Sequence, residues 1–450
     1  MVDWSLSRQD GNGVKALVAG AAVEDITPHD PQYLFGYPHV DRYSTAVHDR
    51  LLSSALYLSD GRTPVLFIAN DIIFVGKATA ERVRGRIERA SGVSAANILV
   101  SATHTHSGPS TVDAISLAGD PTVPQVDAAY LQRFEDGIVA AGVKAVRRAE
   151  PAEAGLAAAD GSAVGTNRRD PAGPADPQTP VLMVRSAANR EPIACMVVCS
   201  MHPTVLREDS MVVSADFPGM TRRYLQENFL GDGCPVLHHT GPAGNQSPRH
   251  VIRGNTLAEA RRLGEALGRA VAAAAEQIRF VASLEMGTRR AFLDLPRRTL
   301  AAVEEAEHRL ECAAQKLAQL RASGAPRQEV RLAEVDWFGA EETVRLARLA
   351  VAGRLEAVYR SCLPAEVQML QIGPWALVGW PGEVFVEHAL AVKARARDAY
   401  VISLANGELQ GYITTEAAAA AGGYEASNAI FAPEAGQLLV DTTLDLIGRG

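Results

Sequence analysis

The sequence is poor in cysteine and has none of the paired cysteines that hold disulfide scaffolds or metal clusters. Its five cysteines form no Cys-x-x-Cys motif, and such a sparse, odd set is typical of a reducing compartment. The first ten residues hold no apolar segment typical of a secretory signal. No stretch is long and apolar enough to span a bilayer. We therefore expect a cytoplasmic protein without stable membrane association.

The sequence also lacks a basic cluster. Its formal net charge is -8 and its pI is near 5.8, and the basic residues are interleaved with acidic ones. This charge balance argues against a nucleic-acid-binding surface, so we expect no nucleic-acid partner. With 450 residues, of which 47% are hydrophobic, the chain can form a large core in one domain or two.

Apolar runs of strand length alternate with amphipathic segments of helix length. The expected strands include residues 64–71, 97–100, 192–199 and 235–237, and the expected helices include 77–90, 127–149 and 256–277. Alternation of this kind is typical of a layered α/β domain. We predict an α/β fold with a mixed, mostly buried central sheet that is flanked by helices.

The composition changes at about residue 300. Residues 300–351 are rich in Ala, Glu, Arg and Leu at helical spacing, with one interruption at 322–326. This pattern predicts a long antiparallel helical hairpin that is inserted into the domain. Its charges indicate a solvated face; the alternative is a subunit contact, through which a homo-oligomer would form. Strand patterns resume at 367–372 and 375–378.

Polar side chains follow several of the apolar runs. His104 and His106 come after the strand at 97–100, and in extended backbone residues two apart point to the same side. The alternative is a pair of surface-loop histidines that bind nothing. His202 and Glu383 also follow apolar runs, as do His239 and Asn406.

Ligands of α/β sheets bind at the carboxyl ends of strands, so these side chains could converge. Two histidines from different strands, together with Glu383, would give zinc its ligands and leave an open position for water. The alternatives are a turn or core histidine at position 202 and a helix N-terminal carboxylate at position 383.

The segment SATHTHSGP at residues 101–109 resembles the zinc-binding segment of the neutral/alkaline (non-lysosomal) ceramidase family. Further segments stand in the family's order and span nearly the whole chain. They are GY at 36–37, TNR at 166–168, HPT at 202–204, SAD at 214–216, GNQSP at 244–248, PGE at 381–383, GYITT at 411–415 and YE at 424–425.

The resemblance implies a single ceramidase-like catalytic domain over residues 1–450 that binds one zinc ion per chain. The implied zinc ligands are His104, His202, Glu383 and Tyr412. The resemblance also implies that His106 and Arg168 bind and polarise the substrate and that Tyr424 assists. Ser247 matches a serine of the family that was once regarded as a nucleophile.

These residue types suit amide hydrolysis. Zinc lowers the pKa of a bound water to about 7, and the oxyanion formed by its attack needs fixed donors such as His106, Tyr424 and Arg168. The alternative is a serine nucleophile at Ser247, with His238 or His239 as its base. Asp71 and Asp216 would either orient the histidines or make loop and cap hydrogen bonds.

The chain departs from the family where Gly-Asp-x-Ser-Pro-Asn is expected, since it has GNQSPR at residues 244–249. A positive charge at Arg249 suits an anionic or polar substrate, and we assign Asn245 and Arg249 to substrate binding. We also expect no C-terminal immunoglobulin-like domain of the kind found in typical ceramidases. A lipid substrate is therefore not implied by the site itself.

The sequence thus predicts a zinc-dependent amidohydrolase in which zinc-bound water attacks a linear amide. The expected partner is a small, soluble N-acyl substrate. The alternatives are a true neutral ceramidase that releases fatty acid from ceramide and a catalytically inactive relative that binds a ligand. Ester or lactone hydrolysis by the same zinc chemistry is a further alternative.

Overall fold

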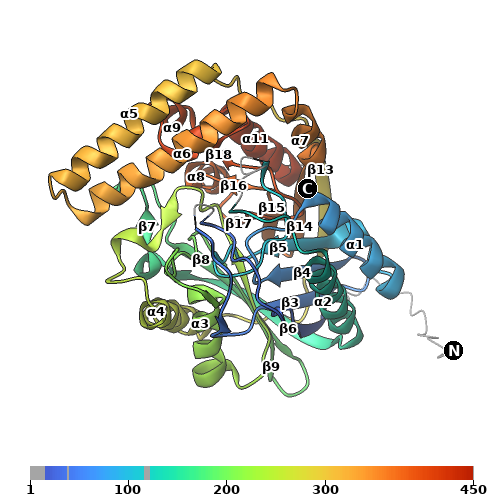
Figure 1. Ribbon diagram of the computed structural model, residues 1–450. Helices are drawn as coiled ribbons and strands as arrows, with labels where there is room; N and C mark the ends of the chain where they lie inside the picture. Colours follow the sequence, from blue (N-terminus) through green and yellow to red (C-terminus); the bar gives the residue numbers. More distant parts are fainter. Residues whose placement is uncertain (1–15, 38–39, 116–121, 449–450) are drawn as a thin grey trace.

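The computed structural model describes residues 16–37, 40–115 and 122–448, and its largest element is an eight-stranded sheet (Figure 1). The strand order is β11-β9-β8-β6-β1-β3-β4-β5. The strands are β1 (Val18–Asp25), β3 (Leu52–Ser59), β4 (Pro64–Asn70), β5 (Ile98–Ala102), β6 (Glu150–Asp160), β8 (Gln178–Ser186), β9 (Pro192–Cys199) and β11 (Val236–Thr240). Pairs β4–β5 and β9–β11 are parallel and the other pairs are antiparallel, so the sheet is mixed as predicted.

One face of this sheet is covered by four helices. They are α1 (Lys77–Ser91), α2 (Ala128–Arg147), α3 (Asp216–Leu225) and α4 (Leu257–Ala275). The alternation of side chains along β4 explains how both faces are buried. Leu66 and Ile68 pack with the residues of α1 and α2, whereas Val65 and Phe67 belong to the core on the opposite face.

The opposite face packs against a second sheet of four strands, in the order β13-β14-β15-β17. These strands are β13 (Met286–Leu293), β14 (Ala365–Ile372), β15 (Trp375–Gly379) and β17 (Ala399–Ile402). Leu370 and Leu377 share a core with Phe67 and Leu99 of the first sheet. The strands after residue 365 therefore do not extend the first sheet; they build a separate layer because both of their faces are apolar.

The outer face of the second sheet is covered by α7 (Leu355–Cys362), α8 (Val386–Arg395) and α11 (Glu434–Gly448). Met369 and Val378 pack among these helices, on the side opposite to Leu370 and Leu377. The order of layers is thus helices, sheet, sheet, helices. The predicted α/β class is confirmed, with two stacked sheets in its centre.

The predicted helical hairpin is present as α5 (Val303–Ala322) and α6 (Arg327–Val351). Figure 1 shows the two helices side by side at one end of the molecule, and Ala306, Val344 and Ala347 pack together between them. Helix α6 also packs against α10 (Tyr424–Asn428). The sequence pattern indicated a solvated hairpin, but one side of α6 faces the interior, where it borders a cavity.

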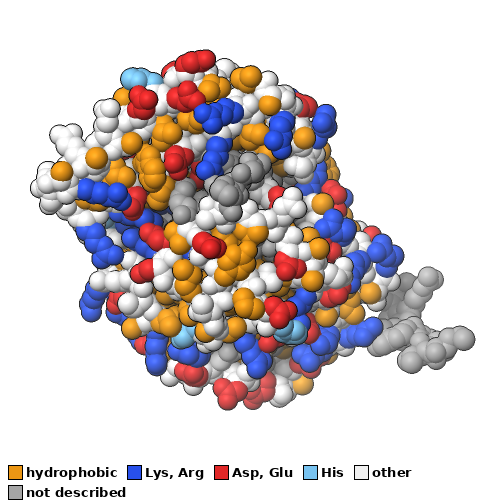
Figure 2. All heavy atoms as spheres, in the orientation of Figure 1, with side chains coloured by type: hydrophobic (Ala, Val, Ile, Leu, Met, Phe, Trp, Pro, Cys, Tyr) orange, Lys and Arg blue, Asp and Glu red, His pale blue; other side chains and the backbone are white. Residues whose placement is uncertain are grey.

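The outer surface mixes charges of both signs. On the face drawn in Figure 2, acidic and basic side chains are interspersed with apolar ones. Among the helices of the described residues, none is both long and apolar enough to cross a membrane.

Candidate metal centre and active-site cavity

His104 lies just beyond β5, and its backbone is left-handed, with φ at 69°. The sequence argument placed His104 and His106 after the strand and assumed extended backbone there, and this assumption is wrong because His104 is left-handed. The two rings nevertheless meet, with their Nε2 atoms 3.4 Å apart. A non-glycine residue in this conformation is strained, and such strain is typical of functional sites.

His202, beyond β9, and Glu383, on the short strand β16 (Glu383–Val384), complete a buried cluster. The Nε2 atoms of His104 and His202 are 3.1 Å apart. Glu383 Oε2 lies 3.2 Å from the first of these nitrogens and 3.0 Å from the second. Three separate parts of the chain, two loops after strands and the short strand β16, therefore deliver their polar groups to one point, as the strand-end argument predicted.

Backbone carbonyls fix the protonation of the rings. His104 Nδ1 donates to the carbonyl of Ile73 at 2.9 Å, and His202 Nδ1 donates to that of Ala243 at 2.6 Å. His106 Nδ1 lies 3.2 Å from the carbonyl of Gly36. Because a carbonyl can only accept, each Nδ1 carries the proton and each Nε2 presents a lone pair in the neutral ring.

When the rings are neutral, lone pairs and a carboxylate converge at this point. Burial, and next the charge of His104, lowers the pKa of His202 to about 4, so this ring is neutral near pH 7. Burial alone would raise the pKa of Glu383, but His104 and His202 outweigh it and hold that pKa well below its usual range.

Acceptors packed this closely repel one another unless a cation lies among them. The ring nitrogens of His104, His106 and His202 lie within 4.8 Å of one another. Nitrogen and carboxylate donors suit zinc, which takes about four of them. The residues present therefore fit a zinc ion.

Tyr412 lies beside Glu383 because β18 (Tyr412–Ile413) pairs in parallel with β16, with these two residues opposite each other. The Tyr412 ring lies 5.7 Å from the ring of Tyr424. The guanidinium of Arg168 is 5.3 Å from the centre of the Tyr412 ring. The sheet pairing brings the two predicted tyrosines and the predicted arginine to the metal cluster, and the role of Tyr412 as a ligand stays a prediction.

Arg168 is buried and paired. Its Nε donates to Glu425 Oε1 at 2.6 Å. Burial lowers the pKa of Arg168, but interactions with Tyr412 and Glu425 outweigh burial and raise it above its ordinary value. Arg168 therefore presents a permanent positive charge to the space beside the tyrosines.

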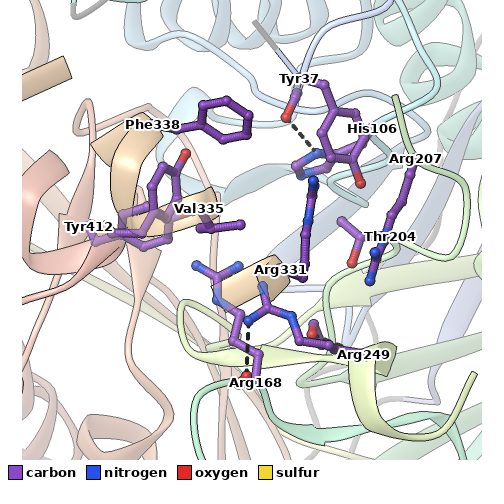
Figure 3. Close-up of a pocket in the computed structure, with 13 residues that line it drawn as sticks. Tyr37, His106, Arg168, Thr204, Arg207, Arg249, Arg331, Val335, Phe338 and Tyr412 are labelled. Carbon is purple, nitrogen blue, oxygen red and sulfur yellow. Dashed lines mark hydrogen bonds between the residues drawn. The ribbon is translucent and has the colours of Figure 1, made fainter. Parts of the chain in front are cut away.

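A cavity opens beside the histidines (Figure 3). All but one of the predicted catalytic and substrate-binding residues line it, and these are His106, Arg168, Ser247, Arg249, Tyr412 and Tyr424. A second hollow of about 590 Å³ lies against His104 and Glu383 and also touches His106, Tyr412 and Tyr424. The two spaces therefore meet at His106, Tyr412 and Tyr424, beside the buried cluster of His104, His202 and Glu383.

Asn245 is the predicted binding residue that the cavity lining leaves out. Its side chain donates to Glu387 at 2.8 Å and accepts from the backbone N–H of Val386 at 3.0 Å. These bonds tie the loop after β11 to the start of α8. The contacts therefore support a structural role for Asn245 and give no support to substrate binding.

The proposed bases for Ser247 lie elsewhere. His239 is within β11 and its Nδ1 is 2.7 Å from Ser101 Oγ, while the ring of His238 packs at 5.9 Å from that of Phe217. Ser247 Oγ accepts from the backbone N–H of Arg249 at 3.3 Å. These contacts do not assemble a serine and a base.

Asp71 and Asp216 make loop and cap contacts and do not orient the histidines. Asp71 pairs with Arg222 at 2.9 Å and accepts from the N–H of Leu52. Asp216 accepts from the N–H of Leu206 at 2.9 Å. The histidines are oriented by backbone carbonyls instead, which a sequence does not reveal.

Several cavity residues had been given no role. Tyr37 stands in one of the quoted motifs, and Arg207 follows His202 by five residues, so only their positions hinted at the site. Arg331 and Phe338 reach the cavity from α6. No local pattern identifies them, because which side of a helix faces inward depends on the packing of the hairpin.

Gly36 supports His106 through a close approach. Its φ is 112°, and a Cβ there would lie 2.3 Å from His106 Nδ1. We expect Gly36→Ala to displace the ring of His106 and to lower kcat/KM by about 10-fold or more. Steady-state kinetics and the free energy of unfolding would be compared with those of Gly231→Ala, where a Cβ meets nothing within 4 Å. Kinetics equal to the parent's would contradict this role of Gly36.

A layered α/β fold that brings histidines and a carboxylate together at strand ends, beside a cavity, is typical of metal-dependent hydrolases. Residues 17–236 match the family model described as neutral/alkaline non-lysosomal ceramidase, N-terminal. The resemblance that the sequence motifs indicated is thereby confirmed.

Two solved structures share the fold. The crystal structure of neutral ceramidase from Pseudomonas aeruginosa matches with a TM-score of 0.75 at 21% identity, over 97% of this chain and 75% of that chain. A structure described as ceramidase complexed with C2 matches with a TM-score of 0.72 at 19% identity, over 97% and 76% of the two chains. The comparison with curated proteins gave no match.

Proposed function

We propose that the protein is a zinc-dependent hydrolase that cleaves the linear amide bond of a small, soluble N-acyl compound. The family match and the fold support a hydrolase that acts on an amide bond. The observation that carries the proposal is the convergence on His104 Nε2, which has His202 Nε2 at 3.1 Å, His106 Nε2 at 3.4 Å and Glu383 Oε2 at 3.2 Å, while every Nδ1 is directed to a carbonyl.

His104, His202 and Glu383, with Tyr412 beside them, would hold one zinc ion per chain. When bound, zinc supplies a Lewis acid that polarises the amide carbonyl and activates water near neutral pH. In the hydrolysis, the oxygen of water bonds to the carbonyl carbon, the carbon–nitrogen bond breaks, and a proton passes to the leaving amine.

The cavity residues can stabilise the charge that develops on the carbonyl oxygen. Burial raises the pKa of Tyr412 and Tyr424 well above the ordinary value, so both phenols keep their protons and can donate. Arg168 adds a fixed cation next to them. Burial, and next His104, lowers the pKa of His106 well below its usual range, so this ring is neutral near pH 7. We assign it the transfer of the proton to the leaving amine.

Product analysis by mass spectrometry tests the proposal. The zinc-loaded enzyme would be given N-acyl compounds from short polar amides to detergent-solubilised ceramide, with a chelator-treated sample as the control. Chelator-sensitive release of acid and amine from the short amides is expected. Release of fatty acid from ceramide alone would support the neutral ceramidase alternative, and turnover of no compound would favour an inactive, ligand-binding relative.

A serine nucleophile is the second mechanism, and Ser247 lines the cavity. We expect Ser247→Ala to slow turnover by less than about 100-fold, because no base among the described residues pairs with its hydroxyl, which then contributes a hydrogen bond and no nucleophile. Quenched reactions of the parent would be searched for an acyl-enzyme by intact-mass spectrometry. Complete loss of activity in the variant, together with a trapped acyl-enzyme in the parent, would favour the serine mechanism.

The proposal includes a cytoplasmic location without a nucleic-acid partner or stable membrane association. It also includes a homo-oligomeric contact through the α5–α6 hairpin. Size-exclusion chromatography with light scattering measures the oligomeric state directly.

A further inference from the structure

Arginines from several parts of the chain converge on the cavity beside the histidines. They are Arg168 after β7 (Thr166–Asn167), Arg207 in the loop after His202, Arg249 after Ser247 and Arg331 on α6. Figure 3 shows their guanidinium groups gathered on one side of the cavity. A further hollow of about 350 Å³ continues outward from Arg207, Arg249 and Arg331 and adds Arg327. A cationic path therefore leads from the surface to the metal cluster.

The positive charge of this path is only partly compensated. Arg168 is paired with Glu425, and Arg331 is paired with Glu208 at 2.7 Å and with Glu334 at 2.6 Å. Within the described part of the chain, no carboxylate forms an ion pair with Arg207 or Arg249, and no Asp or Glu lines either hollow. Two half-buried cations thus lack a counter-charge.

The hydrogen bonds of Arg249 and Arg168 and the pKa of Arg249 agree with an excess of positive charge in the cavity. Arg249 Nη1 donates only to the backbone carbonyl of Arg168, at 3.1 Å. Burial, and next the positive charge of Arg168, lowers the pKa of Arg249 to about 9. Nη2 of Arg168 is buried and makes no hydrogen bond among the described residues. A buried donor without a partner is costly, and an anionic acceptor in the cavity would satisfy it.

The hollow on the other side of the cluster has the opposite character. It is lined by Glu342, Glu383 and Glu408 and by no Lys or Arg among the described residues. Burial raises the pKa of Glu342 to about 7 and that of Glu408 well above its ordinary value. The described lining of this hollow therefore offers an anionic group no cation, whereas the arginines attract one. The two hollows meet at His106, Tyr412 and Tyr424, so a substrate that bridges them has a defined direction.

Resting on the proposed amide hydrolysis, we propose that the substrate is an anionic N-acyl compound. Its carboxylate or phosphate group lies between Arg207, Arg249 and Arg331, while its amide bond lies at the histidine cluster. The anion is not changed by the reaction; it is bound by the planar, bidentate donors that guanidinium groups offer to carboxylates and phosphates. The arginines thereby select the substrate and set its direction in the cavity.

The test compares amides that differ in one group. N-hexanoylglycine carries a carboxylate on the amine side, N-hexanoylethanolamine is its neutral counterpart, and the phosphate ester of the latter carries a phosphate. N-hexylsuccinamic acid places the carboxylate on the acyl side. With the zinc-loaded enzyme, we expect kcat/KM for at least one anionic compound to exceed that of the neutral one by about 10-fold or more.

The variants Arg207→Gln and Arg249→Gln are each expected to reduce this preference to about 3-fold or less. Arg249 also donates a hydrogen bond to the backbone carbonyl of Arg168, so Arg249→Gln changes more than the charge. Arg207→Gln tests the charge without that bond. Arg348→Gln, an exposed arginine of α6 paired with Glu307, is the matched control and should keep the preference. Equal kcat/KM for charged and neutral amides overturns the inference and leaves the proposed hydrolysis intact.

Binding measurements distinguish failure of the proposed hydrolysis from failure of the proposed anion site. Isothermal titration of N-hexanoylglycine and of N-hexanoylethanolamine would be carried out on the parent and on both variants. If no amide is cleaved, the proposed function fails, yet tighter binding of the carboxylate that is lost in the variants upholds the anion site. Equal binding of the two compounds, or carboxylate binding unchanged in both variants, overturns it.

Discussion

Replacing His104 with alanine is expected to abolish zinc retention and to lower kcat by about 1,000-fold or more. His104 Nε2 lies 3.1 Å from His202 Nε2 and 3.2 Å from Glu383 Oε2, so it contributes one of three donors that face one point. Removing it also removes a repulsion between acceptors, so the fold should be largely retained. Zinc content by inductively coupled plasma mass spectrometry and the far-ultraviolet circular dichroism spectrum check both expectations.

Glu383→Ala should behave in the same way, because the carboxylate supplies the negative charge of the cluster. The matched control is His308→Ala, whose ring lies near Cys312 on the exposed part of α5. Its zinc content should equal that of the parent. Equal zinc content in His104→Ala, Glu383→Ala and the parent would refute the ligand assignment.

Replacing Arg168 with methionine is expected to have the second largest effect, on stability and activity together. The change leaves Glu425 buried, with Arg169 at 3.3 Å as its one remaining ion-pair partner among the described residues. Breaking a buried ion pair on one side costs about 3–5 kcal/mol, and removal of a donor beside the oxyanion costs roughly 100- to 1,000-fold in kcat. Urea unfolding and steady-state kinetics at pH 7 measure the two losses.

The pH dependence of the Arg168→Met effect has a definite sign. In the parent, burial raises the pKa of Glu425, but Arg168 and then Arg169 outweigh it and lower that pKa. Its stabilising contribution is therefore present above the unfolded pKa of about 4.3 and is lost as the pH falls through the lowered folded value. In the variant, burial would raise the pKa of Glu425, so the penalty grows as the pH rises.

The difference in unfolding free energy between parent and Arg168→Met should consequently be smaller at pH 4 than at pH 7, by about 1 kcal/mol or more. Arg185→Met removes a partly exposed arginine that pairs with Glu153 at 2.6 Å. It should cost less than about 1 kcal/mol at either pH. If the difference in unfolding free energy between the parent and Arg168→Met is the same at both pH values, Arg168 does not control the pKa of Glu425.

The sequence predicted the site better than it predicted the architecture. Apolar runs that end in His104, His202 and Glu383 placed these side chains at strand ends, and the structure brings all three within hydrogen-bonding distance. The same argument failed for His239 and Asn406. His239 lies within β11, and Asn406 bonds the backbone of Val100 and the side chain of Gln368. A position near a strand end does not by itself make a residue a metal ligand. The direction of the side chain decides whether it reaches the site.

The sequence by itself determined the α/β class, the helical hairpin and the strand-end positions of His104, His202 and Glu383, because each depends on a local pattern of apolar and polar residues. The tertiary structure alone decided that the strands after residue 365 form a second sheet, since an apolar strand does not reveal which sheet it joins.

The tertiary structure also decided that Arg207, Arg249 and Arg331 share one cavity. These arginines come from distant parts of the chain, and the segments of Arg207 and Arg331 show no local pattern that sets them apart from surface arginines. Only the packing of α6 beside the loops of Arg207 and Arg249 brings the three side chains to one cavity.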